Sequence, residues 1–494
     1  MKLNMEGKYR KTVILFIIGL FIGASVIPIV SSENNMFKGH INNTVFPKID
    51  CECTIYVDDD NIAGPWDGSA ENPYKSIQEA IDNAIIGSCI CISNGVYNEN
   101  IVIDGHSKDG LSLCGEDKNL TIIDPNNIAN TDTILLNNVD DVTLTGFTIT
   151  GSGLDFTETG YSQSGIYCKK GIGINIYDNL IHENGNGING DSLSDITIEY
   201  NNISDNLCDG IRGHSKFQIN YNDILHNGYG EGPAEPNGDG ISIWSNADRS
   251  TICHNVIRYN KVDGVWDEGV DGHTISCNTI THNGQAGVHL DEGRICEITD
   301  NIINDNGFGT EFRGIATAGI LLHQSTVNTI SDNTIFNNKN GLFIRQSQSN
   351  YILRNTVIEN DRNGAYLLQT SSTNMKENVF IDNKIGISLL VASGFQINNN
   401  DIYTNQIFGL VAIIGIGTAT ENYWGNVWGP YMGNIVRIIP PFPIVFPWSL
   451  DPNVPDFDNG NMDLQTKNYL TKDNLKPNLI VNYLNNIDYE KWRV

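Results

Sequence analysis

Aromatic, imidazole and carboxylate side chains recur in the sequence at the second and fourth positions after a repeated Gly-Ile corner. Flat aromatic rings offer apolar area on which sugar rings can lie, while carboxylates, imidazoles and guanidinium groups exchange hydrogen bonds with hydroxyls. The candidate substrate-binding residues are Arg212, His214, Trp244, Trp266, Phe343, Arg345 and Tyr366. The candidate catalytic residues are Glu268, His289, Asp291 and His323. This set predicts a carbohydrate-binding face, on which catalysis would be a further step.

Glu268 and Asp291 hold the same offset in consecutive repeats. Their carboxyl groups are therefore expected about 5 Å apart, the separation typical of retaining glycosidases. His323 and His289 offer an alternative, in which an imidazole takes or gives the proton. The same acidic pair would also suit Ca²⁺, which binds carboxylate oxygens. The run Asp58-Asp59-Asp60 is a second calcium candidate, although a polar turn is its simpler interpretation.

A repeat of the form I-x-x-N-x-I-x-x-N-x-x-G-I, from about residue 170 to 425, must position these side chains. Its first asparagines are Asn179, Asn201, Asn222, Asn255, Asn278, Asn301, Asn333, Asn355, Asn378, Asn400 and Asn422. The period is about 22 residues, with two insertions of about ten. Short β-branched runs between Asn and Gly indicate strands joined by sharp corners, because Asn and Gly tolerate the left-handed conformation. Such coils must stack to bury their apolar side, so the repeat predicts a parallel β-helix of about 14 coils.

Strand alternation sets which side chains face outward. The Ile of each corner is expected inside, so the second and fourth residues after the glycine should form two outward columns along the helix. Three insertions, at residues 151–163, 229–238 and 308–317, precede this face at the same corner. We expect them to rise beside the columns and to turn the face into a groove.

The net charge and the N-terminal segment indicate the location of the protein and its possible partners. Across 494 residues the net charge is −28, which would repel a phosphate backbone and argues against a nucleic-acid partner. Residues 1–32 combine four basic residues with the apolar run Val13–Val30, which predicts a signal peptide, or alternatively an uncleaved anchor as the only membrane contact. The protein is therefore expected to be secreted or on the cell surface. There, the cysteine pairs Cys51/Cys53 and Cys89/Cys91 should staple the first layers by disulfides, since their spacing suits a zinc site less well.

The remaining chain divides into segments of different pattern. Residues 33–53 are a linker, and residues 54–130 form an N-terminal cap with the first coils, including a helix within residues 73–84 that plugs the open end. Residues 131–425 are the repeats. The aromatic and proline-rich residues 426–458 are expected to be a C-terminal cap over the last strand edges. Residues 459–494 have no assigned role.

Several motifs carry a family resemblance. They are Ile55-Tyr-Val-Asp-Asp-Asp-Asn61, Gly64-Pro-Trp-Asp-Gly68, Ile77-Gln-Glu-Ala-Ile81, Asn94-Gly-Val-Tyr-Asn-Glu-Asn100, the Asn-x-Ile repeats and Asn422-Tyr-Trp-Gly. Together they resemble the right-handed parallel β-helix repeat proteins of the pectate-lyase-like and NosD-like group, over about residues 54–450. The resemblance implies an all-β, single-stranded right-handed parallel β-helix with coils of about 22 residues, an N-terminal capping helix and an aromatic C-terminal cap.

The sequence does not contain the residue sets that the known activities of that group require. The strings Gly238-Asp-Gly240, Arg212-Gly-His214 and Asp271-Gly-His273 do not match the aspartate and Gly-His-Gly set of polygalacturonases. Arg212 and Arg345 lie several coils apart, unlike a lytic base beside calcium carboxylates. Copper delivery would need clustered His, Met or Cys, and the ten His are spread along the chain.

Three functional hypotheses follow. The first is an exported or surface protein that binds a polysaccharide or other glycan in the outer groove. The second is a polysaccharide hydrolase or lyase using the Glu268, Asp291 and His323 column. The third is a structural surface-layer or adhesion protein.

Overall fold

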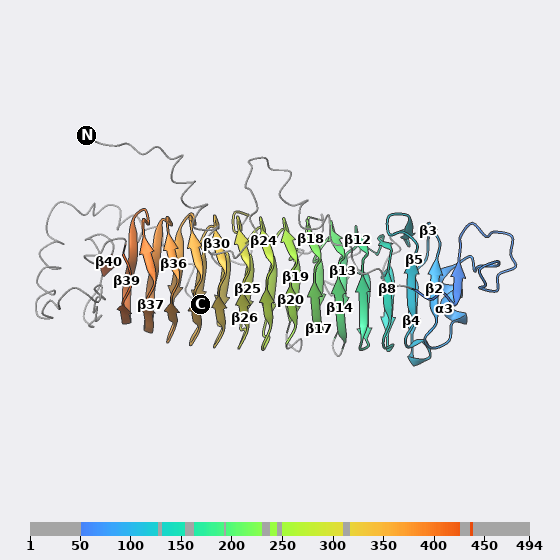
Figure 1. Cartoon of the computed structure of the whole chain (residues 1–494), viewed down its shortest axis with the longest axis horizontal. Helices are drawn as coiled ribbons and strands as arrows, with labels where there is room; N and C mark the ends of the chain where they lie inside the picture. The colour runs from blue at the N-terminus through green and yellow to red at the C-terminus, as the bar shows by residue number, and fades with distance from the viewer. Residues whose placement is uncertain are drawn as a thin grey trace, which may run out of the picture. The chain divides into compact units, whose positions relative to one another are not determined.

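The computed structural model describes residues 51–126, 131–153, 163–191, 194–229, 238–244, 249–309, 317–424 and 435–437. In these residues short strands follow one another in coils along a single axis, from β1 at the blue end to β39 at the red end of Figure 1. Each coil contributes three strands. The strands of successive coils pair in parallel, forming a 27-stranded and a 13-stranded sheet. The predicted all-β parallel β-helix is therefore confirmed.

The strands form three rows. Row one, which carries the candidate site, consists of β4 (Ile101–Asp104), β7 (Ile134–Asn137), β10 (Ser164–Lys170), β13 (Asn186–Gly190), β16 (Ile211–Gly213), β19 (Ile241–Trp244), β22 (Val265–Glu268), β25 (Val288–Asp291), β28 (Ile320–His323), β31 (Leu342–Arg345), β34 (Asn363–Leu368), β37 (Ile385–Asn398), β39 (Phe408–Thr420) and β40 (Ile435–Arg437). Row two consists of β1 (Ile55–Val57), β2 (Cys89–Ile92), β5 (Ser112–Gly115), β8 (Thr143–Thr145), β11 (Ile174–Tyr177), β14 (Asp195–Glu199), β17 (Lys216–Asn220), β20 (Thr251–Cys253), β23 (Thr274–Ser276), β26 (Glu297–Thr299), β29 (Thr329–Ser331), β32 (Tyr351–Leu353) and β35 (Asn374–Lys376), and then the second halves of β37 and β39. Row three is the 13-stranded sheet: β3 (Gly95–Tyr97), β6 (Thr121–Ile123), β9 (Thr148–Ile149), β12 (Leu180–His182), β15 (Asn202–Ser204), β18 (Asp223–Leu225), β21 (Val256–Arg258), β24 (Thr279–Thr281), β27 (Ile302–Asn304), β30 (Thr334–Phe336), β33 (Thr356–Ile358), β36 (Val379–Ile381) and β38 (Asp401–Tyr403).

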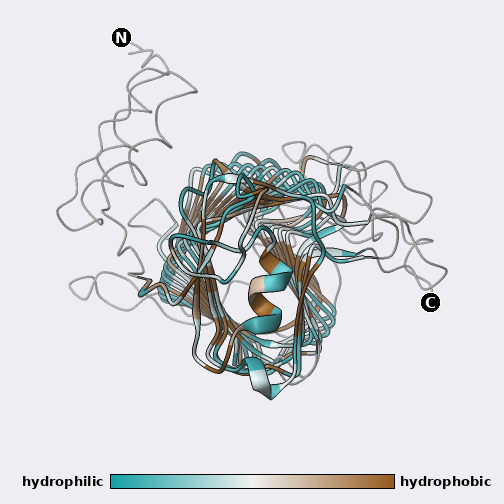
Figure 2. Ribbon diagram, turned by 90° about the vertical axis from the view of Figure 1, so that its right-hand side faces the viewer, coloured by the Kyte–Doolittle hydropathy of each residue, from teal (hydrophilic) through white to brown (hydrophobic). Residues whose placement is uncertain are grey.

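The core is a column of stacked aliphatic side chains inside the coils. Figure 2 looks along the coil axis and shows the hydrophobic residues on the inner side of the strands. Ile241, Ile243, Ile320 and Leu322 are fully buried in this core, as the alternation predicted. Row three adds one inward residue per coil, such as Ile224 and Ile257, because its three-residue strands turn only the middle side chain inward.

Two asparagine ladders close the corners on either side of row three. In the first, the backbone N–H of Asn179 donates to Oδ1 of Asn201 at 3.0 Å, 22 residues further on, and the pattern continues to Asn422. The second runs from Asn184 to Asn405 in the same way. Each amide also donates to backbone carbonyls, so the corner groups that no strand can pair are satisfied inside the fold. Asparagine therefore stacks on asparagine from coil to coil.

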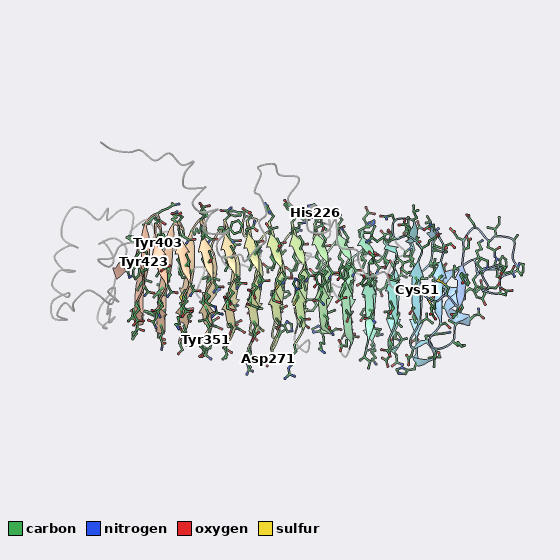
Figure 3. All side chains as sticks on the ribbon, in the orientation of Figure 1. Cys51, His226, Asp271, Tyr351, Tyr403 and Tyr423 are labelled. Carbon is green, nitrogen blue, oxygen red and sulfur yellow. A yellow bond between two sulfur atoms is a disulfide. The ribbon has the colours of Figure 1, made fainter. Side chains whose placement is uncertain are left out.

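The residue before each ladder asparagine takes the left-handed conformation that the corner needs. Examples are Tyr200 with φ of 59° and Tyr221 with φ of 57°. Side chains at these corners repeat from coil to coil, and the rings of Tyr200 and Tyr221 stack with centroids 5.0 Å apart. Near the C-terminal end of the described coils, the rings of Tyr403 and Tyr423, labelled in Figure 3, meet edge to face with centroids 5.8 Å apart. The corners therefore position outer side chains as regularly as the strands do.

The N-terminal coils carry the one α-helix of the described residues, α3 (Ile77–Asn83). Ser76 caps it by accepting a hydrogen bond from the backbone N–H of Glu79. Ile77, Ala80 and Ile81 are buried with the core, and the helix lies across the end of the coil stack (Figures 1 and 2). Its role as the predicted cap remains a prediction.

Several predicted segments lie outside the described residues. These are the N-terminal segment and most of the linker, most of each insertion, the residues 438–494 and nearly all of the proposed C-terminal cap. No helix within the described ranges is long and apolar enough to span a bilayer.

Candidate functional site

Row one places the predicted site residues in two columns. The fourth-residue column is read directly from strand pairing and, from β19 to β31, consists of Trp244, Glu268, Asp291, His323 and Arg345. The second-residue column consists of Arg212, Ser242, Trp266, His289, Leu321, Phe343 and Tyr366. The coil-to-coil alignment predicted from the sequence is therefore the observed register, with neighbours in each column one strand spacing apart.

The fourth-residue column remains accessible. Glu268 is exposed, and Trp244, Asp291, His323 and Arg345 are half-buried. This is the only column of row one between β19 and β31 that combines aromatic, acidic and basic side chains and is also reachable along its described length. An extended ligand laid along the column would meet a different chemical group at each coil.

The second-residue column is largely closed. Phe343, His289 and Arg212 keep 0%, 1% and 6% of their surface exposed. Phe343 and Leu321 pack with Ala286 and Ala318 in an apolar cluster outside the main core, and the rings of Phe343 and Tyr366 stack with centroids 5.0 Å apart. The outward direction predicted for this column is correct, yet these side chains are packed rather than open to solvent.

An aspartate–histidine pair lies in the middle of the fourth-residue column. Nδ1 of His323 is 2.8 Å from Oδ1 of Asp291, and its Nε2 is 3.1 Å from Oε1 of Gln346. The His323 side chain is 15% exposed and that of Asp291 is 24% exposed, so a ligand can reach both. The carboxylate holds the imidazole in one orientation, as a group that transfers protons requires.

Arg345 lies one coil beyond His323 in the same column. Burial lowers the pKa of its guanidinium from the usual value, and the negative charge of Asp291 acts in the opposite direction. Arginine stays charged under either influence, so this coil of the column presents a fixed donor for oxygen ligands.

The tryptophans form a compact aromatic group at the other end. The guanidinium carbon of Arg212 lies 4.6 Å from the Trp244 ring centre, and the His214 ring centre lies 5.2 Å away. Trp266 meets Trp244 edge to face at 5.9 Å. Because these neighbours fix the ring without enclosing it, the half-buried Trp244 offers a preorganised surface.

A row of buried carboxylates beside the columns was missed from the sequence. Asp209, Asp239 and Asp263 are fully buried at the corner that precedes row one. The Oδ1 atom of each accepts a hydrogen bond from a backbone N–H, as it does in the ladder asparagines. Asp263 Oδ1 accepts from the N–H of Ala286 at 2.6 Å, and Asp239 Oδ1 accepts from the N–H of Asp263 at 2.9 Å. The available signal was the residue before the corner glycine, which is Asp on three consecutive coils and Asn or Ala elsewhere in the central repeats.

Two side chains of the second-residue column, the guanidinium of Arg212 and the imidazole of His289, face this row. Arg212 Nη1 lies 3.6 Å from Asp209 Oδ2, and Nδ1 of His289 lies 3.1 Å from Asp263 Oδ2. The Nε2 of His289 is buried and has no hydrogen-bond partner within the described residues. His289 is thus paired with Asp263, not with Asp291, which pairs with His323.

A third such pair lies in the core. Asp267, whose register position is otherwise occupied by Ile243 and Leu290, is fully buried and lies 3.0 Å from Nδ1 of the buried His273. It is inaccessible to any ligand on the outer face. The three aspartate–histidine pairs therefore differ in their accessibility to a ligand on the outer face, and of these only Asp291–His323 can contact one directly.

The residues predicted to bind calcium are not among the groups of ligand atoms that lie close together. Within the described residues, two groups bring three ligand atoms within 4.8 Å of one another: Cys51, Cys89 and Cys114, and the more exposed His106, Asp109 and Asp140. Neither contains Glu268 or Asp291, and Asp58 and Asp59 each accept a backbone N–H, of Asp60 and Val96. Calcium binding at these carboxylates therefore stays a prediction without further support.

Two family models match the chain. The model described as the periplasmic copper-binding protein NosD matches residues 81–273 and 234–317, and the right-handed β-helix region matches residues 308–422. The chain is a right-handed parallel β-helix repeat protein of the pectate-lyase and NosD kind. An uncharacterized protein of Bacillus subtilis, YwoF, is 25% identical to this β-helix protein over 302 residues. The match covers 55% of the chain and 60% of that relative.

Several solved structures are similar to the β-helix protein. The A-module of a mannuronan C-5 epimerase from Azotobacter vinelandii is 15% identical, with 78% of this chain and 100% of that one covered, at a TM-score of 0.42. An alginate lyase from Paenibacillus is 15% identical, with 56% of this chain and 91% of that one covered, at a TM-score of 0.34. A lacto-N-biosidase from Eubacterium ramulus is also 15% identical, covering 75% and 67%, at a TM-score of 0.38.

Proposed function

We propose that this β-helix protein is exported and binds carbohydrate along the fourth-residue column. The observation that carries the proposal is the sequence of groups on one accessible line: the fixed aromatic ring of Trp244, then Glu268, the Asp291–His323 pair and Arg345. Sugars present apolar faces and hydroxyl edges, which match a line that places an aromatic ring beside hydrogen-bond acceptors and donors. Export rests on the charged and apolar N-terminal segment.

A polysaccharide screen tests the binding. The protein is applied to a panel of neutral, acidic and amino-sugar polysaccharides, and retention is scored by affinity electrophoresis or pull-down. Trp244→Ala should lose retention on whichever polysaccharide binds. Tyr351→Ala is the matched control, because Tyr351 is an exposed aromatic residue on row two, away from the proposed column. Equal binding by the two variants would contradict the proposal.

Turnover of the bound glycan is the second candidate. The 2.8 Å Asp291–His323 contact on an accessible column favours it, since an oriented imidazole can transfer a proton, with Glu268 as the neighbouring carboxylate. The same screen, scored for new reducing ends and for unsaturated products, separates hydrolase from lyase. Glu268→Gln and Asp291→Asn should each abolish product while retention persists. If no polysaccharide is retained or altered, the structural or adhesive function remains.

Copper is not part of the proposal, although the matching family model bears that name. Between Trp244 and Arg345 the fourth-residue column has one imidazole, that of His323, and both of its nitrogens already lie within hydrogen-bond distance of protein oxygens. Soft metal ions favour clustered thiolates and imidazoles, which this column does not offer.

A further inference from the structure

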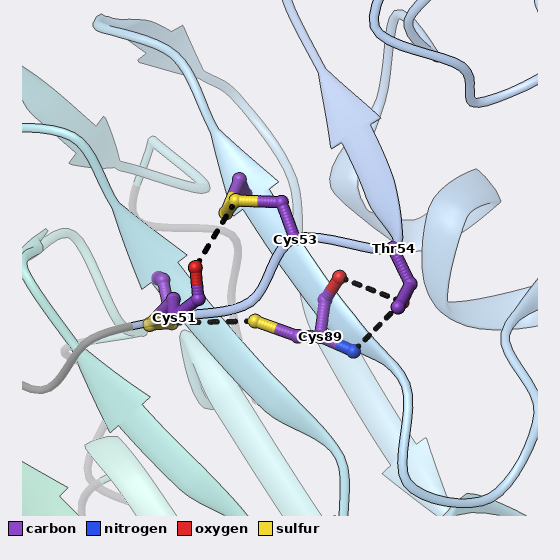
Figure 4. The surroundings of a disulfide bond; sticks show 6 residues. Cys51, Cys53, Thr54 and Cys89 are labelled. Atoms are coloured by element: carbon purple, nitrogen blue, oxygen red, sulfur yellow. Dashed lines mark hydrogen bonds between the residues drawn. A yellow bond between two sulfur atoms is a disulfide. The ribbon is translucent and has the colours of Figure 1, made fainter.

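Five cysteines meet at the N-terminal coils, and five cannot all be paired with one another. Cys51 is bonded to Cys114 and Cys53 to Cys91, which leaves Cys89 as a thiol. Figure 4 shows this thiol lying against the Cys51–Cys114 disulfide. The distance from Cys89 Sγ to Cys114 Sγ is 3.8 Å, and all three sulfur atoms lie within 4.8 Å of one another.

The local backbone holds the three sulfur atoms in place. Cys89 and Cys91 point outward from β2 because strand alternation turns Ile90 and Ile92 into the core. Thr54 fastens the incoming chain to Cys89, with Thr54 N–H donating to the Cys89 carbonyl at 2.8 Å and the Cys89 N–H donating to Thr54 Oγ1 at 3.0 Å. The contact between thiol and disulfide is therefore built into the fold of these coils.

We propose that Cys89, Cys114 and Cys51 form a thiol–disulfide exchange site that presents a reactive thiol at Cys51. The Cys89 thiol loses its proton to solvent base, and the thiolate attacks Cys114 Sγ. The Cys89–Cys114 bond forms as the Cys51–Cys114 bond breaks, and Cys51 leaves as a thiolate that takes up a proton. One disulfide and one thiol are present before and after, so the step needs no oxidant.

The exchange moves the thiol from a protected to an accessible position. Cys89 is 9% exposed, and burial raises the pKa of its thiol, so the thiol itself is a poor target for reagents. Cys51 is half-buried and begins the described chain. The Cys53–Cys91 bond two residues away keeps the released Cys51 near its former partner, so the reverse exchange stays intramolecular.

The ligand of this site is a small disulfide or soft electrophile. A glutathione disulfide would be attacked by the Cys51 thiolate, giving a mixed disulfide at Cys51 and one glutathione thiolate. Because the buried Cys89 must ionise first, the rate of modification should rise about tenfold per pH unit below the thiol pKa.

Native labelling with N-ethylmaleimide tests the proposal. The full oxidised chain carries Cys253→Ser and Cys277→Ser, which remove the two free thiols that are not buried. After labelling at about pH 7 and pH 8, the protein is acidified, digested with pepsin without reduction and mapped by mass spectrometry. The expected result is label on Cys51 together with a Cys89–Cys114 linkage, about tenfold faster at the higher pH.

Two variants make the outcome decisive. Cys89→Ser should abolish the label on Cys51 and leave Cys51–Cys114 intact, with circular dichroism reporting that the fold persists. Cys51→Ser, treated with glutathione disulfide, should form Cys89–Cys114. Four results would each overturn the proposal. They are label on Cys89 beside an intact Cys51–Cys114 bond, label on Cys114, label on Cys51 that persists in Cys89→Ser, and failure of Cys51→Ser to form the new bond.

Discussion

The two columns of row one come from the same strands yet differ in what they offer. The second-residue column is packed, with Phe343 and Leu321 in an apolar cluster and His289 and Arg212 against buried carboxylates. The fourth-residue column is reachable and mixes a ring, acids, an imidazole and a guanidinium group. A binding residue must point outward, but pointing outward does not make it accessible. Some outward side chains are buried by packing outside the core.

The comparison divides the candidate residues by role. Trp244, Glu268, Asp291, His323 and Arg345 can meet a ligand, and Trp266 and His214 support the ring of Trp244. Phe343, Arg212 and His289 instead stabilise the face on which the ligand would lie. Substitutions in the two columns should therefore separate stability from binding.

The largest effect is expected at Phe343. Phe343→Ala should lower the free energy of unfolding by about 3–5 kcal/mol, because the ring is fully buried and its removal leaves a cavity. His323→Ala, one coil earlier in the open column, should cost about 0–1 kcal/mol. Urea denaturation followed by circular dichroism measures both. Similar costs at the two positions would remove the distinction between the columns.

A smaller loss of stability is expected at the corner ladders. Asn278→Ala should cost about 1–3 kcal/mol, because it leaves the Asn255 N–H and the Ile252 carbonyl buried without their 2.9 Å and 2.7 Å partners. Asn175→Ala, on the outer side of β11, is the control and should cost far less, since water replaces its bond to Gly173. An equal cost would mean that the ladder adds nothing beyond ordinary polar contacts.

The ladders also explain how much the sequence could predict. Period, coil boundaries and the inward position of Ile241 or Ile320 follow from alternation and from the Asn and Gly corners, because each is a local property repeated many times. The closure of the second-residue column does not follow, since it depends on packing outside the repeat. The pairing of His289 with Asp263 likewise required knowledge that the residue before Gly-Val turns its carboxylate toward the next coils.

The third effect concerns binding. Trp244→Ala should weaken retention on the bound polysaccharide at least about tenfold, or about 1.4 kcal/mol, since aromatic rings supply much of the energy of such surfaces. The unfolding midpoint should change little because Trp244 is half-buried. Affinity electrophoresis over a range of polysaccharide concentrations measures the change. Phe343→Trp, which keeps a buried aromatic ring, should retain binding if it folds, and loss of binding there would assign the contact to the closed column.

The last effect is a pH dependence of stability near the N-terminal end of row one. Burial raises the pKa of Asp132 to about 6. The hydrogen bond that its carboxylate accepts from the backbone N–H of Ser164 at 2.8 Å lowers the pKa but does not outweigh burial. The unfolded carboxyl titrates near about 3.9, so between about pH 4 and 6 the folded state binds more protons than the unfolded state. Stability therefore falls as pH rises through this window and levels off above it. Asp132→Asn should remove this component, so the difference in unfolding free energy between variant and native protein should grow in favour of the variant from about pH 4.5 to 7.5. Using the difference cancels the titration of groups common to both proteins, and a difference that stays constant with pH would show that Asp132 is as solvated as the residues of the open column.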